Sequence, residues 1–129
     1  MSKQCLIGNP ISCNEMYAPI GRGKLVKTKK YRSWIEKNIP IIKNNLLPPT
    51  KFPITIDVLV MANIKWMERH DPDNLLKPIM DLLVNSQIIP DDNNRYIEQV
   101  SCRFLYCPGP SSDVLTRISY EEPDEIIED

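Results

Sequence analysis

The sequence predicts an α+β fold, in which two main helices pack on one face of a small mixed β-sheet. Apolar residues alternate with a period of about two in several short segments and recur with a period of about 3.6 in two longer ones. The segments follow the order strand, helix, strand, helix, strand, strand, which favours helices gathered on one side of a sheet. The 129 residues suffice for one domain with a modest core.

The first half of the chain predicts a strand, a loop and a helix. Residues 3–8 form the expected strand, and residues 9–27 are expected to be an irregular loop because Pro and Gly interrupt them repeatedly. Thr28 is expected to cap a helix that runs to about Leu47. Pro40 should kink this helix or split it in two.

The middle of the chain predicts the clearest strand and the second helix. Branched side chains alternate along residues 54–64, which favours a strand, and residues 65–72 are expected to be a charged loop. Asp73 is expected to cap a helix over residues 73–86. Because proline fits best in a first turn, Pro78 suggests that this helix begins later.

The last third predicts two strands, over residues 95–107 and 113–120. Residues 1–120 are then one domain. Six of the nine residues 121–129 are acidic, which predicts a mobile C-terminal tail.

Composition argues against several classes of protein. No apolar run approaches the roughly 20 residues that span a bilayer, and the N-terminus lacks a signal-peptide pattern. We therefore expect a cytoplasmic protein without a membrane partner. The cysteines lack the paired spacing of zinc sites, and His70 is the only histidine. Reduced thiols are expected at Cys5, Cys13, Cys102 and Cys107.

The net charge of −1 conceals a strong polarity. Residues 1–70 hold 12 Lys/Arg against 4 Asp/Glu, whereas residues 71–129 hold 4 against 13. This asymmetry predicts two working surfaces, one that attracts anions and one that attracts cations.

The acidic half contains a candidate catalytic cluster. Asp71 and Asp73 are two residues apart and point the same way if the segment is extended. On a helix, the polar side chains fall within an arc of roughly 120°, opposite the leucines. This polar face consists of Asp73, Asn74, Lys77, Asp81 and Asn85.

A second acidic pair, Asp91-Asp92, follows this helix. If the next strand pairs with residues 54–64, the chain returns the pair towards Asp71 and Asp73. Converging carboxylates repel one another unless a cation joins them, and oxygen-only ligands suit Mg²⁺ or Mn²⁺. Such a site can activate water for attack on a phosphate.

Lys77 adds a positive charge one turn from Asp73. Its ammonium can offset charge that develops on a phosphate, and Asn74 can orient a carboxylate or contact a backbone phosphate. A purely structural interpretation also fits these residues. In it, Asp73 is a helix cap, Lys77 joins an ion-pair ladder with Asp73 and Asp81, and Asp91-Asp92 forms an ordinary turn.

The segment from Asp71 to Asp92 resembles the RusA family of Holliday junction resolvases. The family pattern D-x-D-N-L-x-K-x-x-x-D-x-L, followed by a turn ending in D-D, matches residues 71–83 and 88–92. Residues 9–14, with Tyr17, Arg22-Gly23 and Tyr31-Arg32, resemble the family's opening pattern. The resemblance spans most of the chain.

The resemblance implies roles for single residues. It makes Asp71, Asp73 and Asp92 the ligands of Mg²⁺, for which Mn²⁺ can substitute, and Lys77 the catalytic lysine. Asp81 and Asp91 are accessory candidates. It also implies a RusA-like fold, a homodimer, no organic cofactor, and paired symmetric nicks in four-way junction DNA. A two-fold junction suits two active sites related by a two-fold axis.

A nuclease of this family must bind DNA, although the net charge of this chain is negative. Residues 22–43 carry eight Lys/Arg and only one acid, which predicts phosphate contacts, although a merely solvated surface also fits. Trp66, placed in the loop before the acidic motif, is a candidate for stacking on bases, whereas Trp34 is expected in the core. The DNA-binding candidates are Asn14, Arg22, Lys24, Lys27, Lys29, Lys30, Arg32, Trp66 and Asn74.

The favoured interpretation is a metal-dependent endodeoxyribonuclease that resolves four-way DNA junctions in recombination and repair. It would act in the cytoplasm of a bacterium or of a phage-infected host cell. The main alternative is a non-catalytic branched-DNA binding protein, which would need no metal. A structural phage protein, whose acids only cap and pair, is the third interpretation.

Overall fold

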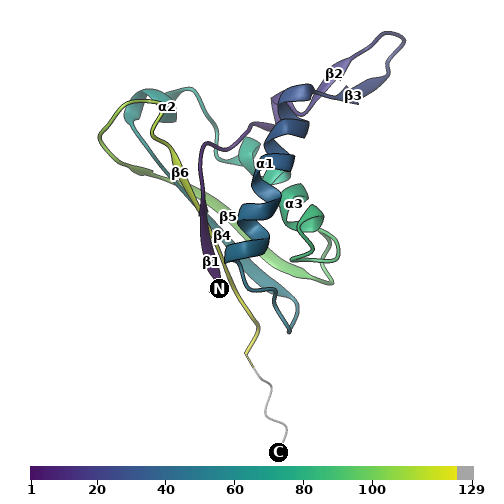
Figure 1. Ribbon diagram of the computed structural model, residues 1–129, viewed down its shortest axis with the longest axis vertical. Helices are drawn as coiled ribbons and strands as arrows, with labels where there is room; N and C mark the ends of the chain where they lie inside the picture. Colours follow the sequence, from purple (N-terminus) through teal and green to yellow (C-terminus); the bar gives the residue numbers. More distant parts are fainter. Residues whose placement is uncertain (125–129) are drawn as a thin grey trace, which may run out of the picture.

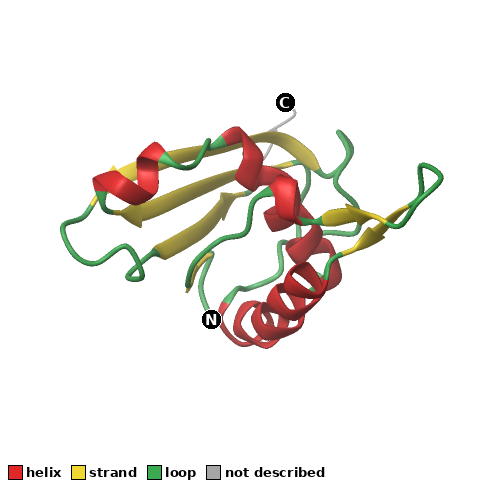
Figure 2. Ribbon diagram, turned by 90° about the horizontal axis from the view of Figure 1, so that it is seen from above, coloured by secondary structure: helices red, strands yellow, loops and turns green. Residues whose placement is uncertain are grey.

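A computed structural model describes residues 1–124 and contains a four-stranded mixed sheet covered on one face by helices (Figures 1 and 2). The strand order is β1-β6-β4-β5, and β4 runs parallel to β5, whereas the other neighbours are antiparallel. This arrangement confirms the predicted fold class. The strands are β1 (Gln4–Ile7), β4 (Ile54–Ala62), β5 (Ile97–Tyr106) and β6 (Leu115–Glu121).

The two long helices, α1 (Lys29–Asn45) and α3 (Asp73–Asn85), pack on the same face of the sheet. Alternate residues of β4, from Ile54 to Ala62, are completely buried against them. Helix α3 contributes most of the apolar partners, in agreement with the apolar arc expected from its sequence. Its buried apolar residues are Leu75, Pro78, Ile79, Met80, Leu82 and Leu83.

Within the described residues, no helix covers the opposite face of the sheet, which mixes apolar with charged side chains. Strand pairing places Met61 between Leu105 and Leu115 in one row. The next row holds Leu59 between Arg103 and Arg117. Leu105 is 47% exposed and Leu115 is 49% exposed, so this apolar surface faces solvent in the single chain.

The prediction of an irregular loop over residues 9–27 is wrong. This segment forms a short 3-10 helix, η1 (Cys13–Glu15), and a hairpin of β2 (Tyr17–Pro19) and β3 (Leu25–Lys27). The hairpin projects beyond the N-terminal end of α1 (Figure 1). Its strands are only three residues long, too short for alternation of apolar residues to reveal them.

The predicted loop over residues 65–72 is also wrong at its start, where the chain forms helix α2 (Ile64–Glu68). Asn63 caps this helix, because its side-chain oxygen accepts a hydrogen bond from Trp66 N at 2.9 Å. One turn is too short to show a helical period.

Both helices tolerate a proline. Helix α1 begins after the expected cap, Thr28, and continues through Pro40 instead of splitting. Helix α3 begins at Asp73 with Pro78 inside it, so the later start is wrong. Asp73 is not the cap either, because it is the first helical residue and its backbone N–H donates to Asp71 Oδ1 at 3.1 Å.

The C-terminal segment stays on the sheet past residue 120. Strand β6 includes Glu121, and the Glu122 carboxylate accepts hydrogen bonds from Thr50 Oγ1 at 3.2 Å and Lys51 N at 3.1 Å. The remainder of the predicted tail, residues 125–129, lies outside the described residues. No helix in residues 1–124 is long and apolar enough to cross a membrane.

Candidate active site

The predicted catalytic residues all lie in the connection between the parallel strands β4 and β5. Parallel neighbours need a crossover, and here the crossover consists of α2, α3 and the turns around them. Asp71, Asp73 and Lys77 occupy the start of α3, and Asp92 precedes β5. Asp92 was expected to approach Asp71 and Asp73 only if β5 pairs with β4. This pairing is confirmed.

Asp73, Lys77 and Asp92 line one hollow of about 420 Å³ between α3 and the start of β5. Its floor includes Met80 and Val100. Asp92, Lys77 and Asp73 are thus brought together by the fold, even though Asp92 comes from a different part of the crossover.

Lys77 forms the centre of an ion-pair network. Its Nζ lies 3.1 Å from Asp81 Oδ1 and 3.1 Å from Asp92 Oδ2. The lysine side chain is 56% exposed, whereas the two carboxylates are more covered. The hydrogen bonds that Lys77 donates to Asp81 and, second, to Asp92 raise the pKa of Lys77, so the group is a stable ammonium at neutral pH.

Asp81 is itself held from α1. The Tyr31 hydroxyl donates to Asp81 Oδ2 at 2.8 Å. Tyr31 is buried, and burial together with this hydrogen bond raises the pKa of its hydroxyl well above the ordinary value. Tyr31, Asp81 and Lys77 therefore form a continuous chain from the core to the solvent-facing hollow. Tyr31 belongs to the pattern that resembles the family's opening, but no local pattern predicts its contact with Asp81, because 50 residues separate the two.

Asp71 faces a neighbouring hollow together with Asn14 and Asn74, two of the predicted DNA-binding residues. Asn74 Oδ1 also lies 3.5 Å from Cys13 Sγ, which joins α3 to η1. Asp71 and Asp73 are thus connected through the backbone hydrogen bond at the start of α3, but their carboxylates line different hollows.

Asp91 stabilises the turn that precedes β5. Its Oδ1 accepts from Asp92 N at 2.8 Å, and its Oδ2 accepts from Asn93 Nδ2 at 3.2 Å. These bonds shape the turn that presents Asp92 to the hollow. The purely structural interpretation of the sequence is thus correct for two contacts. Asp91 forms an ordinary turn, and Lys77 forms an ion pair with Asp81.

The donor set suits a hard cation, because Asp71, Asp73 and Asp92 offer only oxygen. Within residues 1–124, however, no three His, Cys, Asp or Glu side chains are grouped so as to hold a metal ion. The Lys77 ammonium lies against Asp92 instead. A cation at Asp92 Oδ2 would therefore compete with the ammonium for this oxygen.

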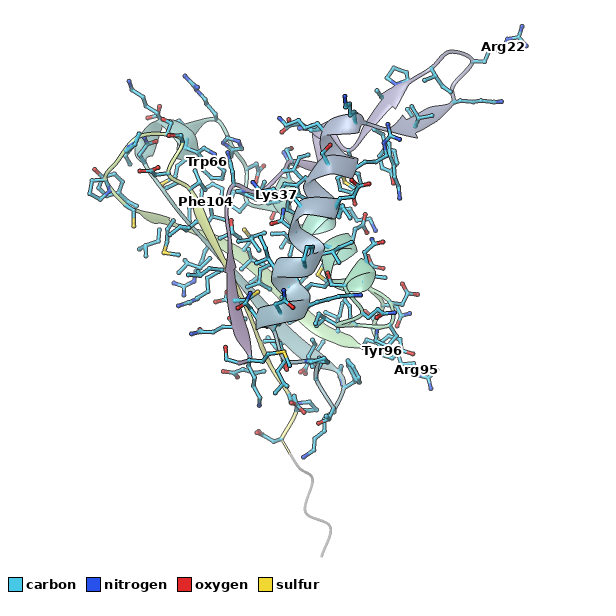
Figure 3. All side chains as sticks on the ribbon, in the orientation of Figure 1. Arg22, Lys37, Trp66, Arg95, Tyr96 and Phe104 are labelled. Atoms are coloured by element: carbon cyan, nitrogen blue, oxygen red, sulfur yellow. The ribbon has the colours of Figure 1, made fainter. Side chains whose placement is uncertain are left out.

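The predicted basic surface divides into two parts. Arg22 and Lys24 lie at the exposed tip of the β2–β3 hairpin, with Lys27 on β3 (Figure 3). Arg22 has φ 48°, between two glycines that also have positive φ. Lys29, Lys30 and Arg32 are exposed on the first turn of α1, where Lys30 pairs with Glu15.

Trp66 differs from its expected place in a loop. It lies in α2, is 5% exposed, and stacks on His70 with ring centroids 3.8 Å apart. Phe104 contacts it edge-on at 5.3 Å. Trp66 is therefore mainly a buried side chain, and His70 is the less buried member of the stack.

The family model of the endodeoxyribonuclease RusA matches residues 8–114, which cover the hairpin, both long helices and the whole acidic crossover. No curated protein matches the chain.

Proposed function

Because the chain belongs to the RusA family of endodeoxyribonucleases, we propose that it resolves four-way DNA junctions by metal-dependent, paired nicking. Its role would be in recombination and repair of DNA in the cytoplasm. The observation that best supports this proposal is the hollow in which Lys77 lies 3.1 Å from Asp92, beside Asp73.

The three aspartates Asp71, Asp73 and Asp92 are the proposed ligands of Mg²⁺ or Mn²⁺. The bound metal would activate a water nucleophile and stabilise charge on the phosphate. A cation held by Asp92 Oδ2 would displace Lys77 from this oxygen. Asp71 offers its second oxygen, since Oδ1 already accepts from Asp73 N.

Lys77 remains beside the phosphate once it leaves Asp92. Asp81, fixed by Tyr31, still holds the ammonium from the other side and keeps it protonated. The ammonium then donates a hydrogen bond to a non-bridging phosphate oxygen, where negative charge grows during cleavage. Asn14 and Asn74, next to Asp71, are placed to contact the adjoining DNA backbone.

A homodimer provides the second active site that paired nicking requires. The open face of the sheet is the proposed interface, because Leu105, Met61 and Leu115 form an apolar row there. The same face carries Arg103 and Asp57, which form an ion pair at 3.8 Å. A surface that carries both positive and negative side chains can be self-complementary under a two-fold axis. The basic residues of one copy then face the acidic residues of the other.

The exposed basic side chains complete the proposal. Arg22, Lys24 and Lys27 on the hairpin and Lys29, Lys30 and Arg32 on α1 are the proposed phosphate contacts. The hairpin and the first turn of α1 lie at one end of the molecule, away from the end of strand β6 (Figure 1).

The decisive test is incubation of the full chain with a synthetic four-way junction and a matched linear duplex, each with and without Mg²⁺. We expect symmetric nicks in the junction only when Mg²⁺ is present. Junction binding without nicks under any metal condition would instead indicate the non-catalytic binding protein. Absence of both binding and nicking would refute a role on branched DNA.

A further inference from the structure

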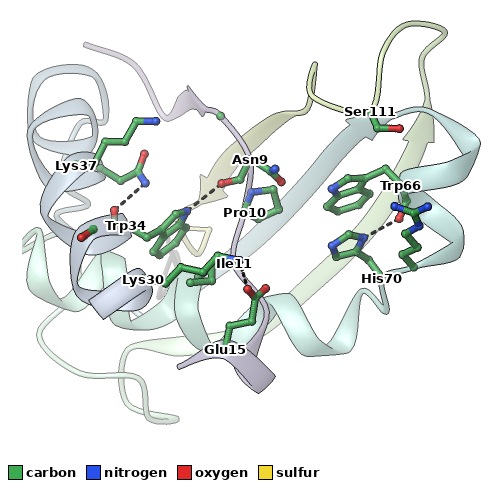
Figure 4. A pocket seen from close by; sticks show the side chains of 14 residues that line it. Asn9, Pro10, Ile11, Glu15, Lys30, Trp34, Lys37, Trp66, His70 and Ser111 are labelled. Atoms are coloured by element: carbon green, nitrogen blue, oxygen red, sulfur yellow. Dashed lines mark hydrogen bonds and ion pairs between the residues drawn. The ribbon is translucent and has the colours of Figure 1, made fainter. Parts of the chain in front are cut away.

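A second cavity, of about 480 Å³, lies between α1, the segment before η1 and α2 (Figure 4). Trp34 and Lys37 of α1 line one side, and Trp66 and His70 line the other, with Asn9 and Pro10 between them (Figure 4). Its volume falls in the range of about 300–1,000 Å³ that is common for pockets that bind small organic groups.

The aromatic walls of this cavity are fixed in place. Trp34 Nε1 donates to Asn9 O at 2.9 Å, which ties α1 to the preceding segment. His70 is stacked on Trp66 with an interplanar angle of 11°, and its Nδ1 lies 2.6 Å from Trp66 O. Rigid aromatic surfaces favour a flat, aromatic ligand because little side-chain freedom is lost on binding.

Cationic side chains surround the aromatic ones. Lys30, Lys37 and Arg69 all line the cavity. Lys30 is paired with Glu15, but within residues 1–124 neither Lys37 nor Arg69 forms an ion pair. An anionic group attached to the flat ligand would therefore find two uncompensated cations at the edge of the cavity.

The cavity continues towards the acidic residues. A smaller hollow of about 220 Å³ shares Glu15, Arg69 and His70 with it and also includes Asp71 and Asn74. A ligand in the cavity is thus positioned next to a proposed metal ligand and not on a remote surface.

We propose that this cavity receives one unpaired nucleotide of the DNA substrate, next to the phosphate that is cut. The base lies between Trp34 and the His70–Trp66 stack, and its phosphates contact Lys37 and Arg69. The aromatic side chains on its two sides suit a single base and not a base pair, so the cavity favours DNA whose strands are open at a branch point. This inference rests on the proposed nuclease function.

The two tryptophans of the chain both line this cavity, so intrinsic tryptophan fluorescence reports on it alone. The experiment titrates the full chain with a four-way junction that carries 2-aminopurine at the branch point, in EDTA to prevent cleavage. We expect quenching of tryptophan emission that saturates together with junction binding. A fully paired linear duplex should give little quenching at equal occupancy.

Variants separate stacking from general binding. His70→Ala removes the accessible aromatic ring, and Lys37→Ala removes a positive charge. Each variant should bind the junction about five-fold or more weakly and should lose most of the tryptophan quenching. His70→Phe keeps an aromatic surface and should retain the quenching. Lys65→Ala, exposed on α2 outside the cavity, is the control and should behave as the original chain. Thermal melting checks that each variant is folded.

The outcomes are distinct from those of the nuclease test. Normal binding and nicking with unchanged tryptophan emission would overturn the cavity proposal and leave the nuclease function intact. Equal quenching by His70→Ala and the original chain would also overturn it. If free dAMP quenched as strongly as the junction at the same concentration, the cavity would be a small-molecule site instead. If the chain neither bound nor nicked the junction, both proposals would fail.

Discussion

Lys77 Nζ lies 3.1 Å from Asp92 Oδ2, although 15 residues separate them in the chain. This contact joins α3 to the turn before β5 across the hollow that Asp73 also lines. The ammonium occupies Asp92 Oδ2, an oxygen that the proposed metal ion would use. Under the proposed function, metal binding there would displace Lys77 towards the phosphate.

Asp73→Asn tests the proposed metal site. Asp73 is exposed and lies on the polar face of α3, so the substitution should leave the fold intact. Replacing one carboxylate by an amide removes a charged oxygen ligand, and we expect nicking of a four-way junction to fall below detection. Junction affinity in a gel-shift assay should change less than about two-fold, because the phosphate contacts remain. Nicking by the purified variant at the original rate would exclude this residue as a ligand.

Asp81→Asn tests whether Asp81 positions Lys77. Without the Asp81 charge, Lys77 should rest on Asp92 alone, and the nicking rate constant should fall about tenfold or more while KM stays nearly constant. Tyr31→Phe should have a smaller effect in the same direction, because Asp81 keeps its charge but loses the hydrogen bond at 2.8 Å.

Stability measurements distinguish this positioning role from a general loss of folding. Tyr31→Phe leaves a half-buried carboxylate with one fewer donor and should lower the free energy of unfolding by about 1–3 kcal/mol in urea titrations. Asp81→Glu, which retains the charge, should recover part of the nicking rate lost in Asp81→Asn. A rate loss in Asp81→Glu equal to that in Asp81→Asn would argue against the role of the charge.

Leu105→Lys and Leu115→Lys test the proposed dimer. Both leucines are about half exposed in the single chain, so the substitutions should not disturb the core. A lysine in the middle of a sheet-to-sheet interface would bury an unpaired charge, and we expect monomers by light scattering after size exclusion. The monomers should nick one strand of a junction without the matching second nick. Dimers that persist in both variants would place the interface elsewhere.

Arg22→Ala and Lys24→Ala test the hairpin as a DNA contact. The hairpin touches no part of the catalytic hollow, so cleavage of bound junction should be unaffected. Each lost phosphate contact should reduce the slope of log binding constant against log salt by about one unit. Lys65→Ala is the control for loss of one positive charge. An unchanged salt slope in the double variant would show that these side chains remain in solvent.

Cys5 should make the protein sensitive to alkaline pH. Burial raises the pKa of the Cys5 thiol from 9.0 to about 11. The folded state therefore holds the proton more tightly, and the stabilisation is complete below pH 9 and is lost as pH rises from about 9 to about 11. Thermal melting across this range should show a smaller decline for Cys5→Ala than for the original chain. Parallel declines would show that other groups dominate.

The sequence was most informative for α3 and its surroundings. The 3.6-residue period placed the leucines in the core and Lys77 on the polar face, because a helix of 13 residues contains several repeats of that period. The approach of Asp92 also followed from the sequence, since it depended only on the pairing of β5 with β4.

Other features depend on contacts between distant segments and leave no local pattern. The hairpin strands β2 and β3 have three residues each, and α2 has five. These segments are too short to show the two-residue period of a strand or the 3.6-residue period of a helix. The Tyr31–Asp81 hydrogen bond joins α1 to α3 only after both helices pack on the sheet. Pro72, and not Asp73, is the N-cap residue of α3, and the Asp71 carboxylate accepts the hydrogen bond from Asp73 N.

The crossover between β4 and β5 has a consequence for the order of events during synthesis. All proposed catalytic residues are already in the chain once residue 92 has been made, but the crossover is closed only by strand β5, which begins at Ile97. Until β5 pairs with β4, the turn that carries Asp92 is not held against Lys77. A growing chain therefore carries the acidic residues before the pairing of β5 with β4 closes the crossover that holds them.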